Sequence, residues 1–294
     1  MSLATGAGLK VLVNGLPCAA IAVADRGLQY GDGVFETLRC ERGTIRWFER
    51  HLARLRRGCA RLAIPAPEGP ILHREALSLL NGNVDSTDDT RAMIKIIVTR
   101  GTAVARGYRP SGAERPNRIV SLYPWSLSQT QEFAVGLSAV RLGCNPLLAG
   151  IKHLNRLEQV LAQQSAAAAG YDEVLMCVGS ASNANTGASS EADEVVCASA
   201  GNLFALIGDE LCTPSLVQCG VEGIMRELVL QLAPQLGLAV RVGPITVAAL
   251  STMRSMWVSN VRLGMQPVHW YEGRRVHIDA RGLQMQELIN ATHR

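Results

Sequence analysis

The sequence predicts a mixed α/β protein with two domains. Its 294 residues are enough to bury two hydrophobic cores of ordinary size. Strand-like and helix-like patterns occur in both halves, and a polar stretch separates them. We therefore expect an N-terminal domain over residues 1–124, a linker over 125–132 and a C-terminal domain over 133–294.

Composition excludes several classes of protein. The net charge of +4 is too small to indicate a nucleic acid or a membrane surface as partner, and only 4% of residues are aromatic. No apolar run is long enough to span a bilayer, and the N-terminus lacks the pattern of a signal peptide. The histidines form no close pair and the cysteines no CxxC pair, so we expect no metal site. Five cysteines are expected to be buried or half-buried thiols of a cytoplasmic protein: Cys144, Cys177, Cys197, Cys212 and Cys219.

Hydrophobic periodicity predicts the main elements of each half. In the N-terminal half we expect strands at 10–13, 34–40, 91–99 and 118–124, and helices at 49–62 and 71–80. In the C-terminal half we expect strands within 133–142 and at 173–178, 195–198, 203–207, 210–213, 239–242 and 256–260. A helix should follow Lys152 and stop at Gly170, and another should cover 226–236, with a long loop at 179–194. The segment after Tyr271 gives no clear prediction.

The sequence holds only three lysines, Lys10, Lys95 and Lys152. Arginine carries the remaining basic charge and does not lose its proton in proteins, so amine chemistry must use one of the three. Lys152 follows a glycine loop and opens a helical pattern, where a side chain can be both held and approached. By spacing alone it is either an ordinary surface lysine or a lysine that forms a Schiff base with an aldehyde cofactor.

The eleven residues from Gly150 to Val160 resemble the segment around the cofactor lysine of the aminodeoxychorismate lyases. The likeness is ungapped and includes the non-catalytic Asn155 and Arg156. This family belongs to the fold type IV pyridoxal-phosphate enzymes, together with D-amino acid and branched-chain aminotransferases. The resemblance implies a homodimeric α/β enzyme of the D-amino acid aminotransferase-like fold, with pyridoxal 5′-phosphate bound to Lys152.

The stretch from Asp25 to Thr37 reads DRGLQYGDGVFET and resembles the entry segment of the same family. Its glycines and charged residues alone would be ordinary loop chemistry. The resemblance implies that Tyr30 lines the mouth of the site and that the Thr37 hydroxyl lies beside the lysine and the substrate. The aminotransferases usually differ at the Thr37 position, so this threonine favours the lyase.

Four arginines, at positions 50, 54, 57 and 61, share one face of the helix predicted at 49–62. Such a row is typical of a solvated face, although a guanidinium also matches phosphate oxygens with paired hydrogen bonds. The residues His51 to Leu55 resemble the family's H-x-x-R-L motif. The resemblance implies that Arg54 holds the cofactor phosphate with His51 as a neighbour.

Two further segments carry candidate binding residues. Arg106 and Tyr108 lie on a loop that could contact substrate carboxylates or could simply be exposed, and the loop resembles the one in the lyases. A glycine-rich segment opens the helix predicted at 226–236, and a helix N-terminus favours phosphate. The resemblance implies that this segment binds the phosphate through backbone amides, and that Ser259 and Asn260 lie near the cofactor. The segment's residues are Gly223, Ile224 and Met225.

One position departs from the family pattern. The family has a glutamate five residues before an Asn-Leu-Phe triplet, and this glutamate pairs with the pyridine nitrogen of the cofactor. Here the triplet begins at Asn202, and the corresponding residue is Cys197. A thiol is a poor partner for a pyridinium, so the ring would be a weaker electron sink. A register shift could bring in Glu194 instead.

These observations lead to one functional prediction with two alternatives. The resemblance implies a lyase that converts 4-amino-4-deoxychorismate to 4-aminobenzoate and pyruvate, a step towards folate, with Lys152 and Thr37 moving protons. The first alternative is a class IV aminotransferase acting on D-amino or branched-chain amino acids. The second is a non-catalytic homologue, for which Cys197 is the main argument.

Overall fold

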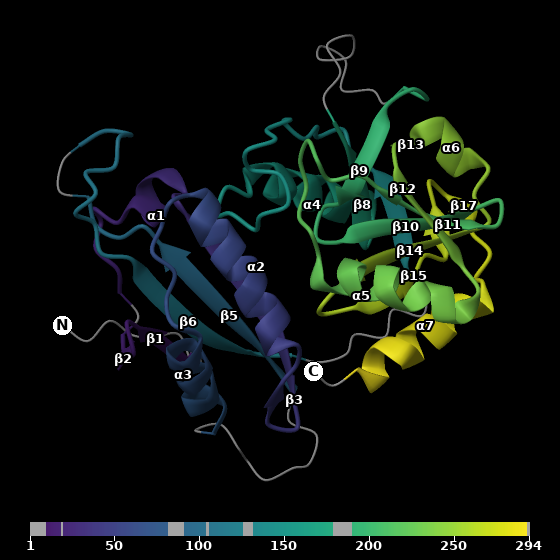
Figure 1. The fold of residues 1–294 in the computed structure, drawn as a ribbon. Coiled ribbons are helices and arrows are strands. Elements are labelled where there is room, and N and C mark those ends of the chain that lie inside the picture. Colours follow the sequence, from purple (N-terminus) through teal and green to yellow (C-terminus); the bar gives the residue numbers. More distant parts are fainter. Residues whose placement is uncertain are drawn as a thin grey trace. The chain divides into compact units, whose positions relative to one another are not determined.

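The computed structural model describes residues 10–18, 20–81, 91–103, 106–125, 132–178 and 190–292, which form two compact units (Figure 1). Unit 1 holds the described residues up to 125 together with Ile151–Asn155. Unit 2 holds 132–150 and 156–292. The predicted linker lies almost entirely outside the described residues, so that boundary stays a prediction. Lys152, expected within the C-terminal domain, belongs to a short segment that packs in unit 1.

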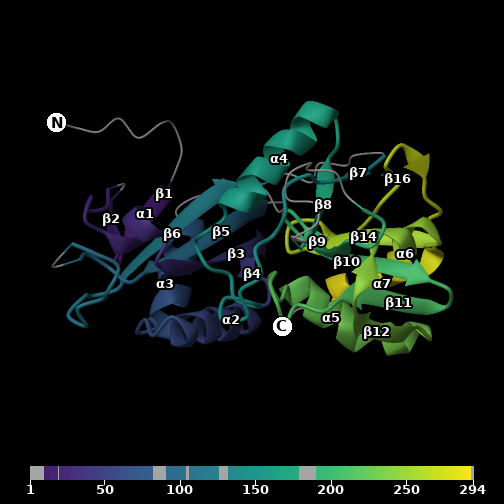
Figure 2. The ribbon, with the colours of Figure 1, turned by 90° about the horizontal axis from the view of Figure 1, so that it is seen from above.

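Unit 1 is one antiparallel sheet with helices on one face. The strands lie in the order β2-β1-β6-β5-β3-β4. The elements are β1 (Lys10–Val13), β2 (Leu16–Pro17), α1 (Arg26–Tyr30), β3 (Gly33–Glu41), β4 (Thr44–Ile45), α2 (Phe48–Arg61), α3 (Gly69–Asn81), β5 (Arg91–Thr99) and β6 (Asn117–Pro124). Helices α2 and α3 cover the same face of the sheet, α2 against β3 and α3 against β6 (Figure 2).

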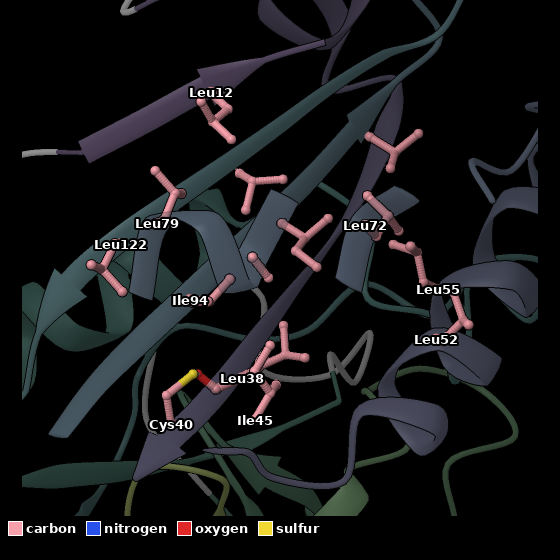
Figure 3. Packing of buried hydrophobic residues seen from close by; sticks show 14 of the residues in the cluster. Leu12, Leu38, Cys40, Ile45, Leu52, Leu55, Leu72, Leu79, Ile94 and Leu122 are labelled. Carbon is pink, nitrogen blue, oxygen red and sulfur yellow. The ribbon is translucent and has the colours of Figure 1, made fainter. Parts of the chain in front are cut away.

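The core of unit 1 lies between this sheet face and the two helices (Figure 3). Leu38 and Ile94 project from β3 and β5 and belong to the same cluster as Leu52 of α2 and Leu72 of α3. Side chains on a strand alternate between faces, so residues 34, 36, 38 and 40 of β3 all point towards the helices. Glu36 is therefore a carboxylate in a row of core positions.

Unit 2 is built around two sheets, β12-β11-β10-β14-β15 and β13-β9-β8-β7-β16-β17. The strands are β7 (Ala134–Leu137), β8 (Glu173–Cys177), β9 (Glu194–Ala198), β10 (Asn202–Ile207), β11 (Glu210–Pro214), β12 (Ala239–Gly243), β13 (Ile245–Thr246), β14 (Ser255–Asn260), β15 (Gly264–Pro267), β16 (Trp270–Tyr271) and β17 (Arg274–Arg275). The helices are α4 (Leu157–Ala169), α5 (Ile224–Leu232), α6 (Val247–Ser251), α7 (Ala280–Ala291) and the 3₁₀ turn η1 (Ala233–Leu236).

Buried apolar side chains gather in several clusters in the described part of unit 2, and two of them lie near the predicted site. One contains side chains from both sheets, among them Leu175 of β8 and Val258 of β14. The other lies under α4, whose small Ala162 and Ala166 let the helix pack against β8 and β9. Helices α5 and α7 pack against each other and against β14 and β15.

Most predicted strands are confirmed, and three predictions are wrong in an instructive way. The stretch after Asp25, whose residues alone predict a loop, forms helix α1, because the Asp25 carboxylate caps the backbone N–H groups of Gly27 and Leu28. Lys152 does not open a helix, since α4 begins only at Leu157. Cys144 is exposed rather than buried. Helix α7 was missed because its apolar residues are spread around the helix, with Met285 and Ile289 buried but Leu283 exposed, so they form no clear stripe.

Candidate functional site

The segment that carries Lys152 lies along the open edge of β3. The backbone N–H of Phe35 donates to the Lys152 carbonyl oxygen at 2.9 Å, and the N–H of Leu154 donates to the Gly33 carbonyl at 3.0 Å. Between them, Val34 and His153 form an antiparallel bridge. These bonds use backbone groups that an edge strand otherwise leaves unpaired, so the backbone at Lys152 is fixed to a rigid sheet.

The Lys152 side chain reaches the ring of Phe35. Its Nζ lies 4.3 Å from the ring centroid, and Nζ of Lys95 lies 5.3 Å from the same centroid. Thr37 is opposite Lys95 across β3 and β5, and two residues from Phe35, so the three side chains share one face of the sheet. The Thr37 hydroxyl and the Lys95 ammonium group therefore lie on the face of the sheet that carries Phe35, the ring that Lys152 contacts. The predicted closeness of Thr37 to Lys152 stays a prediction.

A buried charged cluster lies on the other face of β3. The Glu36 carboxylate accepts from Arg54 Nε at 2.8 Å and from Arg54 Nη2 at 2.6 Å, and it contacts His51 Nδ1 at 2.7 Å. His51 and Arg54 lie three residues apart on α2, so both face the same strand. The side chains of Glu36, His51 and Arg54 are 1%, 1% and 6% exposed. Arg54 thus differs from Arg57 and Arg61, which are exposed as an arginine-rich helix face predicts.

The cluster fixes the charge of its members. Burial raises the pKa of Glu36, but the Arg54 guanidinium and the bonds from Arg54 and His51 outweigh it and lower that pKa to about 2. Burial lowers the pKa of His51, with Glu36 opposing and the charges of Arg54 and Lys152 adding to the decrease. Among the described residues, His51 Nε2 is a buried atom with no hydrogen-bond partner.

The residues predicted to bind substrate form a second group in unit 1. The rings of Tyr30 and Tyr108 meet edge to face, with centroids 5.4 Å apart. Arg26 holds this pair: its guanidinium stacks on Tyr30 and donates to the backbone carbonyls of Gly107 and Tyr108 at 3.0 and 2.7 Å. Tyr108 and Arg106 are exposed, as a loop that meets a soluble ligand requires. Their predicted contact with carboxylates stays a prediction.

In unit 2, the N-terminus of α5 leaves its first backbone N–H groups available. Gly223 is the N-cap, and no side chain caps the helix. A Cβ at Gly223 would lie 2.1 Å from Oδ1 of Asn202, so a larger residue there would displace this buried side chain, whose Nδ2 donates to the Val221 carbonyl. The side chains of Ile224 and Met225 are buried, so only their backbone could meet a ligand.

Ser259 and Asn260 end strand β14 and differ in their surroundings. Ser259 is opposite Asn202 across the sheet, is 1% exposed, and its Oγ is buried without a hydrogen-bond partner in the described part of the chain. Asn260 donates to the Ala200 carbonyl at 3.0 Å and accepts from the N–H groups of Arg262 and Leu263. The Ser259 hydroxyl therefore keeps an unused hydrogen-bonding capacity among the described residues, whereas the Asn260 side chain holds a turn.

Cys197 lies on β9 in the apolar cluster under α4. It is 7% exposed and pairs with Met176, and burial raises the pKa of its thiol to about 12. Glu194 stays at the start of the strand, opposite Thr246, although a bulge does interrupt the pairing of β8 with β9. The register shift that would replace the thiol by a carboxylate is therefore absent from the described strands.

Sequence reasoning missed Glu36, although the strand pattern around it indicates a buried carboxylate. A charged residue between Val34 and Leu38 in an alternating strand points into the core, where a carboxylate needs a cationic partner. It also gave no sign that Lys95 lies opposite Thr37 and Asn202 opposite Ser259, because both neighbours depend on pairing across the sheets. Within the described ranges no group of three or more acidic, cysteine or histidine side chains could hold a metal ion, and no helix is long and apolar enough to cross a membrane.

Comparison with known proteins gives a consistent family. The model of the class IV aminotransferases matches residues 33–271. The chain is 33% identical to an aminodeoxychorismate lyase of Vibrio harveyi over 261 residues, 87% of this chain and 89% of that protein. It is 25% identical to a D-alanine aminotransferase of Listeria innocua, over 96% of this chain and 94% of that protein.

A solved structure agrees with these relatives. The 4-amino-4-deoxychorismate lyase of Pseudomonas aeruginosa matches with a TM-score of 0.82 and 36% identity, over 96% of this chain and 98% of that one. The expected fold, that of the fold type IV pyridoxal-phosphate enzymes, is therefore confirmed. Because both the family model and these relatives span most of its length, the chain belongs to the class IV aminotransferase family.

Proposed function

We propose that the protein is a pyridoxal-phosphate-dependent lyase that converts 4-amino-4-deoxychorismate to 4-aminobenzoate and pyruvate in folate synthesis. The observation that carries this proposal is the likeness over nearly the whole chain to two lyases of that name, at 33% and 36% identity. Lys152, fixed along β3, supports it as the amine that the chemistry needs.

The residues present fit the cofactor. His51 Nε2 and Ser259 Oγ are buried polar atoms without a hydrogen-bond partner among the described residues. The uncapped N-terminus of α5 and the buried Arg54 suit a phosphate group. We propose that Lys152, Arg54, His51, Ser259 and the first backbone amides of α5 hold pyridoxal phosphate. When bound, this cofactor supplies an aldehyde that condenses with amines and a ring that accepts electrons.

The chain's own residues would move protons and hold the substrate. In the proposed reaction the amine of Lys152 takes the proton from the amine-bearing ring carbon of the substrate, and the enolpyruvyl group then leaves as the ring becomes aromatic. Lys152, helped by the Thr37 hydroxyl on the same face of the sheet, returns a proton to the leaving group. Tyr30, Arg106 and Tyr108 are proposed to contact the substrate, whose two carboxylates match a guanidinium.

The three lysines allow a direct test. After borohydride reduction of the protein with pyridoxal phosphate, peptide mass spectrometry should find the label on Lys152, and absorbance in the near-visible should disappear. Lys152→Ala should lose the label and reduce pyruvate release at least about a hundredfold, the low end for removing a proton-transfer group. Lys10→Ala is the matched control and should keep the label. A label on Lys95 instead would overturn the assignment.

The aminotransferase alternative rests on the D-alanine aminotransferase relative, and Cys197 weighs against it. Transamination depends on the electron sink of the cofactor, whereas aromatisation gives the lyase a separate driving force. Cys197→Glu should therefore leave pyruvate release within roughly a factor of ten of the native rate, since no transition-state contact is removed. Cys197→Ala is its control for packing. A Cys197→Glu protein that binds the cofactor but releases no pyruvate would contradict the proposed mechanism.

We also propose a cytoplasmic homodimer. The family resemblance supports the dimer, and eight free thiols support a reducing compartment. Sedimentation should give twice the chain mass of 31.5 kDa, and a species of single chain mass would contradict the dimer.

A further inference from the structure

The charges of the Glu36 cluster cancel before any ligand arrives. Glu36 is ionised and Arg54 carries a permanent positive charge, and the two are joined by a pair of hydrogen bonds of 2.8 and 2.6 Å. His51 is buried, which favours the uncharged imidazole. A carboxylate held this tightly by an arginine reduces the attraction of that arginine for a second anion.

The contact with Glu36 also decides which nitrogen of His51 carries the proton. An ionised carboxylate only accepts hydrogen bonds, so His51 Nδ1, at 2.7 Å from it, must be the N–H donor. In the neutral ring Nε2 is then a bare acceptor. It is buried, and no described group bonds to it. Such an atom lowers the stability of the protein unless something binds there.

A phosphate dianion at Arg54 would add two negative charges to a buried site that already holds Glu36. Burying net charge is costly, so a proton should be taken up with the phosphate. We propose that His51 is this proton acceptor: when the phosphate binds, His51 Nε2 gains a proton from water, and the imidazolium bonds Glu36 through Nδ1 and faces the phosphate with Nε2. Glu36 is then a positioning residue that sets the donor and acceptor roles of both neighbours.

No other charged group that acts on His51 can take this role. Arg54, from the same helix, is already charged and does not titrate. Glu36, from β3, binds a proton only near pH 2. Lys152, from the segment along the edge of β3, is the residue assigned to the aldehyde. An imidazole, by contrast, gains or loses a proton near neutrality.

The inference rests on the proposed function, and one nuclear magnetic resonance experiment separates the two. Full-length protein labelled with ¹⁵N in histidine is measured at pH 8, where an ordinary histidine is neutral. His51→Gln identifies its signal among the six histidines. Without ligand, His51 should be neutral with the proton on Nδ1. With pyridoxal phosphate, it should become imidazolium, while absorbance reports binding independently. Pyridoxal lacks the phosphate and should leave His51 neutral.

Each other outcome has a defined meaning. If pyridoxal phosphate binds and His51 stays neutral, or if pyridoxal alone protonates it, the inference is overturned and the proposed function stands. Absence of binding overturns both. A proton on Nε2 in the free protein contradicts the positioning role of Glu36.

Variants give a second readout. His51→Gln should weaken the binding of pyridoxal phosphate roughly tenfold or more, the loss of one charge-assisted bond, with no comparable effect on pyridoxal. His73→Gln, on the exposed side of α3, is the matched histidine control and should change neither. Glu36→Gln should bind pyridoxal phosphate without protonating His51 at pH 8, because the carboxylate that stabilises the imidazolium is gone. Equal weakening for both ligands in His51→Gln would indicate a merely structural residue.

Discussion

Glu36 of unit 1 and Glu173 of unit 2 are both buried carboxylates with several hydrogen bonds, yet their pKa values move in opposite directions. Glu36 meets a guanidinium, and its pKa falls from 4.5 to about 2. Glu173 accepts from the side chain of Gln163, the hydroxyl of Ser199 and three backbone N–H groups, and burial still raises its pKa. Neutral donors do not offset the desolvation of a carboxylate, whereas a paired cation does.

Among these variants, Glu36→Ala should lower the free energy of unfolding most, because it leaves the Arg54 guanidinium buried without its carboxylate. Breaking a buried ion pair from one side costs about 3–5 kcal/mol. Urea unfolding followed by circular dichroism would measure the loss, with the exposed Glu68→Ala as the matched control. A change under about 1 kcal/mol, the value of an exposed pair, would mean that the cluster is not the buried pair described above.

The same pair predicts the acid side of the stability profile. Glu36 binds a proton less readily when folded, so its stabilising contribution is complete above pH 4.5 and disappears as the pH falls from 4.5 towards 2. Glu173 has the opposite sign: its pKa is raised on folding, so its contribution falls as the pH rises above 4.5. In Glu36→Gln the free energy of unfolding should fall less steeply between pH 4.5 and pH 2 than in the native protein. An equally steep fall in that variant would contradict the low pKa of Glu36.

Glu173→Gln should change the free energy of unfolding least. The amide keeps an oxygen for Ser199 and Gln163 and removes a charge for which the described residues provide no cationic partner. The main loss is the bond from the Ala200 N–H, so the unfolding free energy at pH 7 should change by less than about 1.5 kcal/mol. Thermal unfolding at pH 7 and pH 5 would measure it. Destabilisation as large as that of Glu36→Ala would mean that Glu173 has a cationic partner when folded.

The sequence was sufficient to predict an element where its pattern depends on neighbouring residues alone. The strand predicted at 91–99 is β5, and the helix predicted at 49–62 is α2 within one residue at each end. Prediction failed where a residue distant in the sequence determines the burial or the conformation of a side chain. Arg54 follows the spacing of an exposed arginine row, and only Glu36, on a strand 18 residues earlier, makes it a buried ion pair. Lys152 stands in a helical pattern, but its backbone is hydrogen-bonded to the open edge of β3, so the helix begins only at Leu157.

The segment at residues 151–155 has a second consequence, for the solubility of the protein. It covers the edge of β3 at Gly33 and Phe35, where a bare strand would offer its backbone to another chain. A fragment of unit 1 that ended near residue 125 would expose this edge and should aggregate through it. The same five residues would therefore both keep this edge from pairing with another chain and carry Lys152, the amine of the proposed reaction, so removing them should affect both.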